Sequence, residues 1–462
     1  MSVVPHVRIL PDGRLESQLA DSKPLYSDAE AIAEANRCLY CHDAPCIAAC
    51  PTGIDIPTFI RKISTENVRG SARAILTANL LGFSCARVCP VEVLCAGACV
   101  YNAWERTPIA IGRLQRYATE TVLTKGTAAS LLPKAPANGK RIACVGSGPA
   151  SLACAGYLAL EGCTVTVYEK RAVAGGLNVT GVAPYKMPSS AGSAEVEFIE
   201  SLGVTIRTGV TVGQDVSVDD LLAQHDAVFL GCGLGADAAL EVPGADGDGV
   251  VGAVAWIERM KLQPGYALAG VTSAVVIGGG NTAIDAAREL AKLGVPEVVM
   301  LYRRTEADMS GYAHELELAR TEGVRLIEKA VPASFVRTGS ALAAVQLVDG
   351  RTIPAQLAVL AIGQASMAPL ATAFPGVQVD AKGRVQAETG TGRTANPKVW
   401  VGGDATGGDL VVTAVQDGKR AGKTVDQVSA AWKTPAQYKG YEAMPIPVRV
   451  KADVELIYKE TK

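Results

Sequence analysis

The chain has 462 residues, of which 48% are hydrophobic and 19% are charged, a globular balance that excludes wholesale disorder. At about 150 residues per domain, this length predicts about three domains. Lysine and arginine total 44 against 46 aspartate and glutamate, a net charge of -2, and no dense basic run is present. Nucleic-acid binding is therefore not expected.

The sequence contains no uninterrupted apolar stretch of about 18 residues, and no signal peptide is evident. We therefore expect a soluble, cytoplasmic protein without a membrane segment. Many of its 48 glycines follow β-branched runs, as in IACVGSGPA and AVVIGGGNTA. This placement favours tight strand-to-helix turns that hold phosphates over flexible linkers.

Eight of the twelve cysteines lie in two groups in the first hundred residues. The groups are Cys38-x2-Cys41-x4-Cys46-x3-Cys50-Pro51 and Cys85-x3-Cys89-x5-Cys95-x3-Cys99. Disulfides are disfavoured because no secretory signal is evident and the chain is long enough to form a core without them. Structural zinc prefers two close pairs of thiolates, which these spacings fit less well. Closely spaced runs that end in Cys-Pro favour iron–sulfur clusters.

The segments around these cysteines, such as AEAIAEANRC and GSARAILTANLLG, are alanine-rich and compatible with helices. We expect an α-helical domain from about residue 25 to 125. In two-cluster ferredoxins the fourth cysteine of a run commonly binds the other cluster, so two interleaved sets of ligands are the natural arrangement.

The first candidate dinucleotide site is KRIACVGSGPASLACAGYLALEGCTVTVYEK. A β-run ends at Gly146-Ser147-Gly148, a helix-like stretch follows, and the next β-run ends at Glu169. An acidic residue about 20 positions after the glycines accepts a hydrogen bond from the adenosine ribose in such folds. The third turn position is Ser151 instead of glycine or alanine, a tolerable departure.

The second candidate is TSAVVIGGGNTAIDAARELAKLGVPEVVMLYRR, with Gly278, Gly280 and Ala283 at the turn positions. Its second strand ends in Arg303 and Arg304, which can pair with a 2′-phosphate and favour NADP over NAD. The alternative is an exposed basic turn beside acidic neighbours.

A third segment, VWVGGDATGGDLVVTAVQDGKRAG, ends a strand at Gly403 and Asp404, and a helix is expected from about Val411. Asp404 could hold the ribityl or diphosphate side of a flavin. Hydride donors release two electrons together, whereas clusters carry one at a time, and flavin is the usual converter. We therefore expect FAD at the first site and the nicotinamide at the second. Because hydride transfer depends on positioning, we predict no catalytic side chain.

Over nearly its whole length the chain resembles the NAD(P)H-oxidising half of dihydropyrimidine dehydrogenase and the related small subunit of glutamate synthase. The shared motifs are RCLYCHDAPCIAACP, CARVCP, VGSGPASL, AGGL at 174–177, YKMP at 185–188, GGGNTAIDAA, AIGQ at 361–364 and VGGDA. The stretches ANLLGFSCARVCPVEVLCAGACV and IAIGRLQRYATE resemble the dihydropyrimidine branch more closely.

The resemblance implies an α/β fold in which an N-terminal α-helical domain with two 4Fe-4S clusters precedes two Rossmann-like domains. The implied division is an iron–sulfur domain at 1–125, the first part of the FAD domain at 139–255, an inserted NAD(P)H domain at 256–365, the second part of the FAD domain at 366–432 and a tail at 433–462. The tail alternates apolar and charged residues, as either a strand that docks on a partner or an edge strand of this chain would.

The resemblance also implies the site residues. One cluster would be held by Cys38, Cys41, Cys46 and Cys99, and the other by Cys50, Cys89, Cys95 and Gln115. Spacing alone would name Cys85 instead of Gln115. The residues around FAD would be Gly146, Gly148, Pro149, Ala150, Ser151, Leu152, Glu169, Gly176, Leu177, Lys186, Val212, Gly403 and Asp404. Those around NADH or NADPH would be Gly279, Gly280, Asn281, Thr282, Arg303, Arg304, Ala361, Ile362 and Gly363. Ser310 stands where NADPH-dependent relatives can have a third basic residue.

In the single-chain animal enzymes of this family an FMN-containing barrel follows, whereas this chain ends at Lys462. The resemblance therefore implies an electron-input subunit whose separate FMN partner reduces uracil or thymine to the 5,6-dihydro product. One alternative is the small subunit of glutamate synthase, which serves a glutamine-splitting partner and tends to have Glu where Gln115 stands. Another is a ferredoxin-like structural module with a vestigial flavin site, against which the intact glycines and Glu169 argue.

Overall fold

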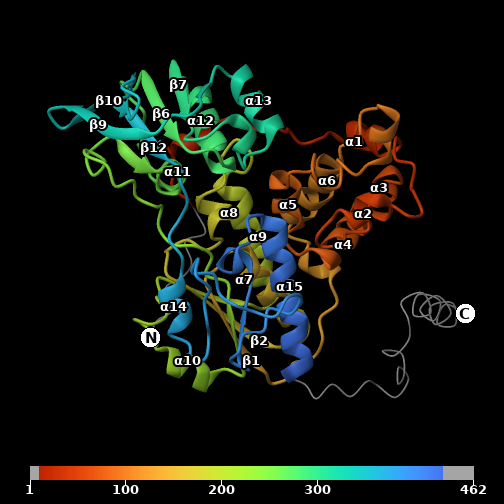
Figure 1. Cartoon of the computed structure of the whole chain (residues 1–462). Coiled ribbons are helices and arrows are strands. Elements are labelled where there is room, and N and C mark those ends of the chain that lie inside the picture. The colour runs from red at the N-terminus through yellow and green to blue at the C-terminus, as the bar shows by residue number, and fades with distance from the viewer. Residues whose placement is uncertain (1–9, 430–462) are drawn as a thin grey trace, which may run out of the picture.

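The structure is a computed structural model that describes residues 10–429. These residues form a helical domain and two α/β domains (Figure 1). The tail expected at 433–462 lies outside the described residues. Among residues 10–429, no helix combines the length and apolar character that a membrane span requires.

The helical domain precedes both sheets in the chain and lies beside the first α/β domain (Figure 1). Its elements are α1 (Asp28–Ala35), α2 (Pro45–Ala48), α3 (Ile56–Ser64), α4 (Val68–Ala78), α5 (Gly82–Val88), η2 (Val100–Trp104), α6 (Ile111–Thr124) and η3 (Ala129–Leu131). Local sequence explains the helix starts, because Ser27 and Glu30 form a capping box on α1 and Asp55 caps α3. Apolar residues of α3 recur at helical spacing and are buried.

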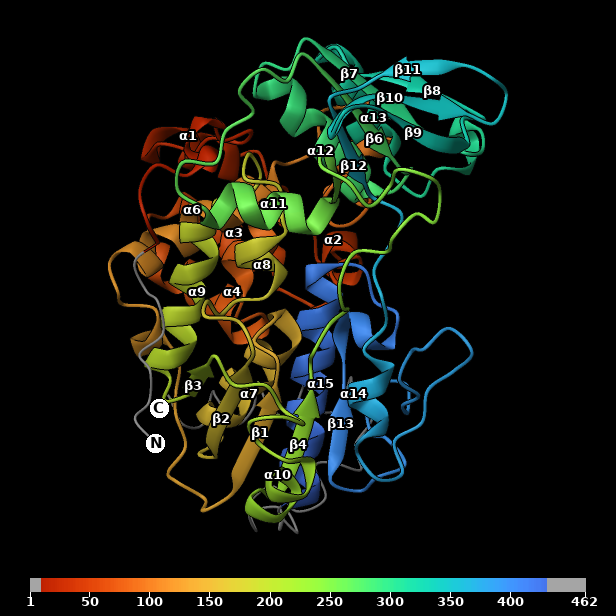
Figure 2. The same ribbon diagram turned by 90° about the vertical axis from the view of Figure 1, so that its left-hand side faces the viewer.

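The first α/β domain has a five-stranded parallel sheet in the order β13-β4-β1-β2-β3 (Figure 2). Its strands are β1 (Arg141–Val145), β2 (Thr164–Glu169), β3 (Thr205–Thr208), β4 (Ala227–Leu230) and β13 (Val399–Val401). Its helices are α7 (Pro149–Leu160), α8 (Leu177–Thr180), α9 (Ser189–Ser201), α10 (Val218–Gln224), α14 (Ala368–Thr372), η5 (Gly403–Thr406) and α15 (Val411–Ser429). The domain is built from two separate parts of the chain, since β13 and α15 follow the second α/β domain.

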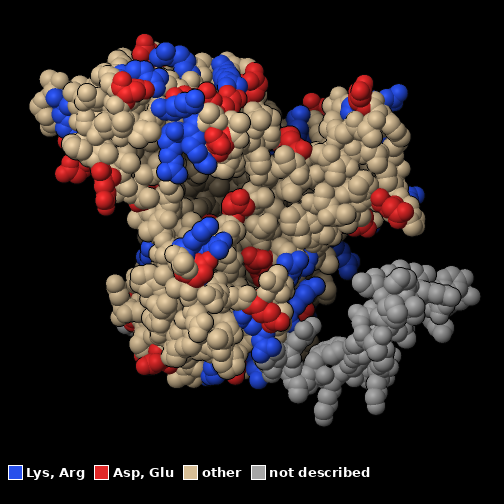
Figure 3. Space-filling view, viewed as in Figure 1, with Lys and Arg blue, Asp and Glu red and all other residues tan. Residues whose placement is uncertain are grey.

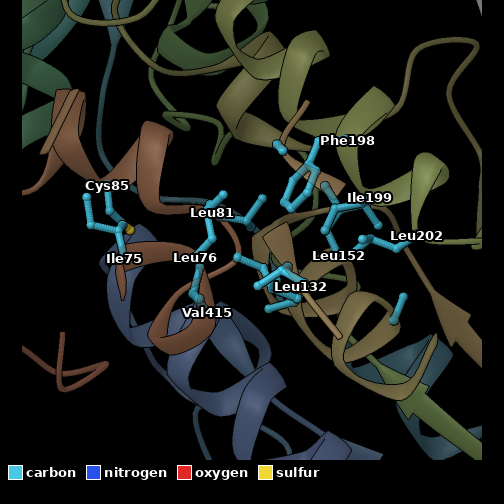
Figure 4. Packing of buried hydrophobic residues seen from close by; sticks show 14 of the residues in the cluster. Ile75, Leu76, Leu81, Cys85, Leu132, Leu152, Phe198, Ile199, Leu202 and Val415 are labelled. Atoms are coloured by element: carbon cyan, nitrogen blue, oxygen red, sulfur yellow. The ribbon is translucent and has the colours of Figure 1, made fainter. Parts of the chain in front are cut away.

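Helix α15 packs closely against α7 because glycine lies at their contact. A Cβ atom on Gly418 would lie 2.0 Å from the carbonyl oxygen of Ala150. The interface with the helical domain is equally dense. Leu76 and Leu81 belong to the same buried cluster as Leu152 of α7 and Phe198 of α9 (Figure 4). Since a continuous core joins these two domains, their relative position is fixed by packing.

The second α/β domain contains a parallel sheet in the order β5-β12-β6-β7-β8 and a three-stranded sheet in the order β11-β10-β9. Its strands are β5 (Val250–Gly252), β6 (Ser273–Ile277), β7 (Glu297–Leu301), β8 (Arg325–Ile327), β9 (Pro332–Thr338), β10 (Ala341–Leu347), β11 (Thr352–Pro354) and β12 (Leu357–Leu360). Its helices are α11 (Ala253–Leu262), α12 (Asn281–Lys292), η4 (Glu306–Asp308) and α13 (Ala313–Thr321).

Two segments lie on this domain although the sequence suggested other places for them. Strand β5 pairs with β12, so the second sheet begins before the expected boundary at residue 256. The short helix η1 (Leu15–Gln18) was expected within the helical domain. Leu15 and Leu19 instead share a buried cluster with Trp256 and Met260 of α11, so the apolar side chains of η1 pack on the second α/β domain.

Candidate functional site

A cavity of about 1000 Å³ lies where the three domains meet. The first α/β domain contributes the β1–α7 turn, the end of β2, α8 and η5, and the second contributes parts of α12 and α13. Residues 87–90 of the helical domain complete the wall. Figure 3 shows a hollow between the two α/β domains with Lys and Arg side chains on its rim.

The β1–α7 turn places glycines on the cavity wall at the start of α7. Gly146 has φ +86°, and a Cβ atom there would lie 2.8 Å from the carbonyl oxygen of Gly231. Gly148 is the N-cap of α7 and offers no side chain to the first turn, which begins with Pro149. A helix start without a side-chain cap is suited to an anion such as a pyrophosphate.

Glu169 stands at the end of β2, as the sequence predicts for the acid that follows such a turn. Its carboxylate is buried at the cavity wall and accepts hydrogen bonds from the N–H and hydroxyl of Ser147, at 2.9 and 2.7 Å, and from the N–H of Arg171 at 2.8 Å. These bonds hold the carboxylate beside the glycine turn, where a ribose hydroxyl can reach it.

Most of the residues expected around FAD lie on the cavity wall, and two do not. Those on the wall are Gly146, Gly148, Pro149, Ala150, Glu169, Gly176, Leu177, Lys186, Val212, Gly403 and Asp404. Ser151 and Leu152 are buried behind it, because α7 turns them toward the sheet and the α7–α9 contact.

Asn178, the residue after Leu177, was not predicted from the sequence as a site residue. It is 3% exposed, lies on the cavity wall and donates from Nδ2 to the hydroxyl of Ser84 at 2.9 Å. Its Oδ1 atom is buried and has no hydrogen-bond partner among the described residues. A buried unpaired acceptor is costly, so this atom fits a bound group that has an N–H or O–H donor.

The cavity is closed on one side by the return of the chain at η5. Gly403 has φ +74° and donates its N–H to Asp417 Oδ2 at 3.0 Å, which joins η5 to α15. Burial, with the nearby charges of Asp409 and Asp417, raises the pKa of Asp404 to about 6. This carboxyl group is therefore suited to a hydroxyl partner more than to a phosphate.

The turn between β6 and α12 repeats the same design in the second α/β domain. A Cβ atom on Gly278 would lie 2.3 Å from the carbonyl oxygen of Ala361, and one on Gly279 would lie 2.4 Å from the ring of Tyr302. Gly280 is the N-cap of α12 and places no side chain on its N–H groups. Asn281 and Thr282 line the cavity, and residues 361–363 follow β12 beside this turn.

Arg303 and Arg304 are exposed at the end of β7. Arg304 donates to the hydroxyl of Tyr302 at 2.7 Å. The hydroxyl of Ser310 lies 3.5 Å from where a Cβ atom of Gly280 would be, so a short neutral side chain stands beside the turn.

Lys186 joins the two α/β domains across the cavity. Its ammonium lies 2.7 Å from Asp285 and 2.9 Å from Glu315. Burial alone would lower the pKa of Lys186, but these two carboxylates outweigh it and raise the pKa. The sequence predicted this lysine as a flavin neighbour, and its ion pairs with the second domain were not foreseeable from the motif.

Four cysteines surround a small apolar cavity of about 30 Å³ in the helical domain. They are Cys38, Cys41, Cys46 and Cys99, the same four that the resemblance groups together. Burial and the nearby Cys38 raise the pKa of Cys46 to about 11, so its thiol needs a positive partner to ionise near neutral pH.

The other four cysteines of the two groups lie near one another, since Cys85, Cys95 and Cys50 all influence Cys89. The pKa of Cys89 is raised well above its ordinary value by a hydrogen bond with Cys85, by burial, and by the charges of Cys95 and Cys50. Gln115 is buried on α6 and donates from Nε2 to the carbonyl oxygen of Gly82 at 2.6 Å. Among residues 10–429, no three His, Cys, Asp or Glu side chains are arranged to hold a single metal ion.

Cys89 also lies on the wall of the central cavity, next to Pro90. The second cysteine group therefore adjoins the space that the β1–α7 turn and η5 enclose. Sequence spacing contained no signal for this arrangement, because Cys89 is 57 positions from Gly146 and 314 positions from Gly403.

Comparison with known proteins agrees with this arrangement. A family model described as dihydropyrimidine dehydrogenase domain II, 4Fe-4S cluster, matches residues 15–127. A second, described as pyridine nucleotide-disulphide oxidoreductase, matches residues 140–418, which is more than half of the chain. The chain belongs to this second family. It carries the cluster domain of the first at its N-terminus.

Two kinds of relative cover most of the chain. The NAD-dependent dihydropyrimidine dehydrogenase subunit PreT of Escherichia coli (strain K12) is 34% identical over 416 residues, covering 89% of this chain and 97% of the relative. The glutamate synthase [NADPH] small chain of the same organism is 30% identical over 431 residues, covering 86% and 91%. Both members of the resemblance that the motifs suggested are thus confirmed as relatives.

Solved structures agree on the fold. Thioredoxin reductase of T. acidophilum superposes with a TM-score of 0.52 at 22% identity, over 63% of this chain and 99% of that one. Mycobacterium tuberculosis FprA in complex with NADPH gives 0.50 at 21% identity, over 70% and 89%.

The chain is therefore an NAD(P)H-dependent oxidoreductase that uses FAD and 4Fe-4S chemistry. The predicted fold class, a helical cluster domain followed by Rossmann-like domains, is confirmed. The iron–sulfur interpretation of the cysteines is confirmed over zinc and disulfides by the match to a 4Fe-4S domain. The turns without side chains, the unpaired acceptor of Asn178 and the size of the cavity all fit FAD.

Proposed function

We propose that this protein is the electron-input subunit of a dihydropyrimidine dehydrogenase. It would oxidise NAD(P)H at FAD and pass electrons through two 4Fe-4S clusters to a separate FMN subunit, which reduces uracil or thymine to the 5,6-dihydropyrimidine. The observation that carries this proposal is the position of Cys89, on the wall of the same cavity as the β1–α7 turn and Asp404. A cluster that Cys89 helps to hold would therefore lie beside a flavin bound in this cavity.

The proposed ligands form two sets of four. Cys38, Cys41, Cys46 and Cys99 would hold the cluster remote from the cavity, which the 30 Å³ space at their centre supports. Cys50, Cys89, Cys95 and Gln115 would hold the one beside the cavity. Closely spaced cysteines around two neighbouring sites are typical of two-cluster domains.

Gln115 is the unusual member of the second set, and its hydrogen bond supports the role. Because Nε2 is held by the carbonyl oxygen of Gly82 at 2.6 Å, Oε1 is the atom left for a metal. Cys85 forms a hydrogen bond with Cys89. We therefore assign Cys85 as a neighbour that supports the ligand Cys89, and not as a ligand itself. An amide ligand in place of a thiolate leaves the cluster less negative and should raise its potential.

When bound, FAD and the clusters convert the two electrons of a hydride into single-electron transfers. The residues of this chain bind and orient. Glu169 would receive the ribose of FAD, Asp404 its ribityl hydroxyls and Asn178 Oδ1 a donor on the flavin. Gly279 to Thr282 would receive the nicotinamide dinucleotide, with residues 361–363 opposite.

Arg303 and Arg304 would meet the 2′ position of the adenosine ribose. Two exposed guanidinium groups suit the 2′-phosphate of NADPH, whereas Ser310 beside Gly280 is neutral. The relative of the dihydropyrimidine type is NAD-dependent, and that of the glutamate synthase type is named for NADPH. The choice between them is a matter for kinetics with both cofactors.

The second candidate function is the small subunit of glutamate synthase. It is favoured by the 30% identity to such a chain, and it would leave the flavin and cluster sites unchanged. The difference lies in the partner, a glutamine-splitting chain. Gln115 argues against this candidate, since a glutamate is expected there in that branch.

The deciding experiment isolates the protein from its native extract without oxygen and identifies the chain that accompanies it. We expect an FMN protein, and we expect the pair to oxidise NADH or NADPH when uracil is added. A large glutamine-splitting partner, with oxidation that depends on glutamine and 2-oxoglutarate, would support the second candidate. Iron content near eight atoms per chain, as opposed to four, tests the two-cluster assignment.

A further inference from the structure

Lys419 reaches from the first α/β domain into the helical domain. It lies on α15, and its ammonium donates to the carbonyl oxygens of Thr52 and Ala78 at 2.9 and 2.7 Å. These two acceptors come from separate segments of the helical domain, one two residues after Cys50 and the other at the end of α4. The side chain is thereby held in place beside the loop that follows Cys50.

The hydroxyl of one buried residue, Thr52, lies against the sulfur of Cys50. The hydroxyl oxygen of Thr52 lies 3.3 Å from Cys50 Sγ. Asn79 donates from Nδ2 to that same oxygen at 3.3 Å, and its Oδ1 is occupied by the N–H of Leu81 at 3.0 Å. Because Asn79 uses Thr52 as an acceptor, the hydroxyl hydrogen of Thr52 is left for the sulfur. Thr52 and Asn79 are both buried.

Among the described side chains, Lys419 has no ion-pair partner, since no carboxylate lies within 4.0 Å of its ammonium. Burial lowers the pKa of Lys419 to about 8, Lys423 and Arg420 of the same helix also lower it, and a Cys50 thiolate raises it. Below that pH the ammonium is the main form, so it is present at pH 7.

Helix α15 serves both sides of the electron path. Val411 and Ala414 in its first turns line the central cavity, and Asp417 holds the N–H of Gly403. Lys419 follows two residues later and contacts the loop after Cys50. A single helix thus lines the central cavity at its start and places a positive charge near Cys50 further along.

We propose that Lys419, together with the hydroxyl of Thr52, raises the reduction potential of the cluster that Cys50 holds. This inference rests on the proposed function, which assigns Cys50 to the cluster beside the cavity. Adding one electron makes that cluster one unit more negative, and a nearby ammonium and a donor to its sulfur stabilise the added charge. The electron derives from NAD(P)H through the flavin, and no bond or proton at Lys419 changes. Lys419 does not receive the electron itself. It acts on the reduction potential of the cluster that does.

The test uses the whole protein, purified without oxygen, and a reductive titration followed by electron paramagnetic resonance at pH 7. Lys419→Met removes the charge, Lys419→Arg keeps it, and Lys423→Met is the control for a loss of charge elsewhere on α15. We expect a lower midpoint potential for one cluster in Lys419→Met, with the other cluster unchanged. In Lys419→Arg and Lys423→Met, both potentials should stay close to those of the wild type.

A second variant, Thr52→Val, leaves α15 intact and decides the matter if Lys419→Met does not fold. It should lower the potential of the same cluster. Unchanged potentials in Lys419→Met, or an equal fall in Lys419→Arg, overturn the role of the charge, and unchanged potentials in Thr52→Val overturn the role of the hydroxyl. Iron analysis before the titration distinguishes a failure of this inference from a failure of the proposed function. Half the expected iron would refute the two-cluster assignment of the proposed function.

Discussion

Glu195 on α9 makes a testable prediction about stability and pH. Its carboxylate is 1% exposed and accepts hydrogen bonds from the N–H groups of Phe83 and Ser84, at 2.9 and 3.0 Å, and from the hydroxyl of Ser84. Burial outweighs these bonds and raises its pKa to about 7 from an ordinary value of 4.5. The group thus ties the first α/β domain to the start of α5, and it changes charge near neutral pH.

The sign follows from proton binding. Between pH 4.5 and 7 the folded protein holds a proton on Glu195 that the unfolded chain has lost, so stability falls as the pH rises through this window. A difference of about 2.5 units corresponds to about 3 kcal/mol, and most of it appears between pH 5 and 8. Glu195→Gln mimics the protonated form, because its amide can donate to the Ser84 hydroxyl, and it should not show this loss.

The measurement is the melting temperature of wild type and Glu195→Gln at several pH values, without oxygen. Between pH 5 and pH 8, we expect the melting temperature of the wild type to fall by roughly 5 °C relative to that of Glu195→Gln. Glu197→Gln is the matched control, since Glu197 is exposed on the same helix and should show no such gain. A constant difference between Glu195→Gln and wild type across the pH range would refute the reasoning.

Three further changes test the sites directly. Gln115→Leu should remove about half of the bound iron and leave NAD(P)H-dependent dye reduction by the flavin largely intact; an equal collapse of dye reduction would mean that the assumed electron order is wrong. Gly176→Ala places a Cβ atom 2.6 Å from Gly148 Cα at φ +55°, so the purified protein should lose most of its bound FAD, as measured by the fluorescence of the FAD released on denaturation. Replacing both Arg303 and Arg304 by serine should raise KM for NADPH about tenfold or more and change KM for NADH little, as initial rates with both cofactors would show.

The parts of the site that depend on local backbone geometry could be predicted from the sequence. Gly146 and Gly278 have φ values of +86° and +149° and lie against carbonyl oxygens, so a side chain at either position would collide. Glu169 follows its turn at the spacing that a β-α-β unit imposes. Such constraints act within about 30 residues and leave a readable pattern.

Contacts between distant segments left no such pattern. Asn178 and Ser84 are 94 positions apart, and Lys419 and Thr52 are 367 apart. Their residue types are ordinary for surfaces and loops, so a single sequence offers nothing to pair them. The position of Cys89 on the flavin cavity, and of η1 on the second α/β domain, likewise depend on how domains pack.

Buried apolar contacts join the first α/β domain to both of its neighbours around the central cavity. Leucines, among them Leu81 and Leu152, join it to the helical domain as a single core. Tyr185 of the first α/β domain lies in one buried cluster with Trp256 and Met260 of the second. Lys186 adds ion pairs with Asp285 and Glu315 across the same contact. Because a packed apolar core holds a distance fixed, the proposed flavin-to-cluster distance would be set by the core of the protein.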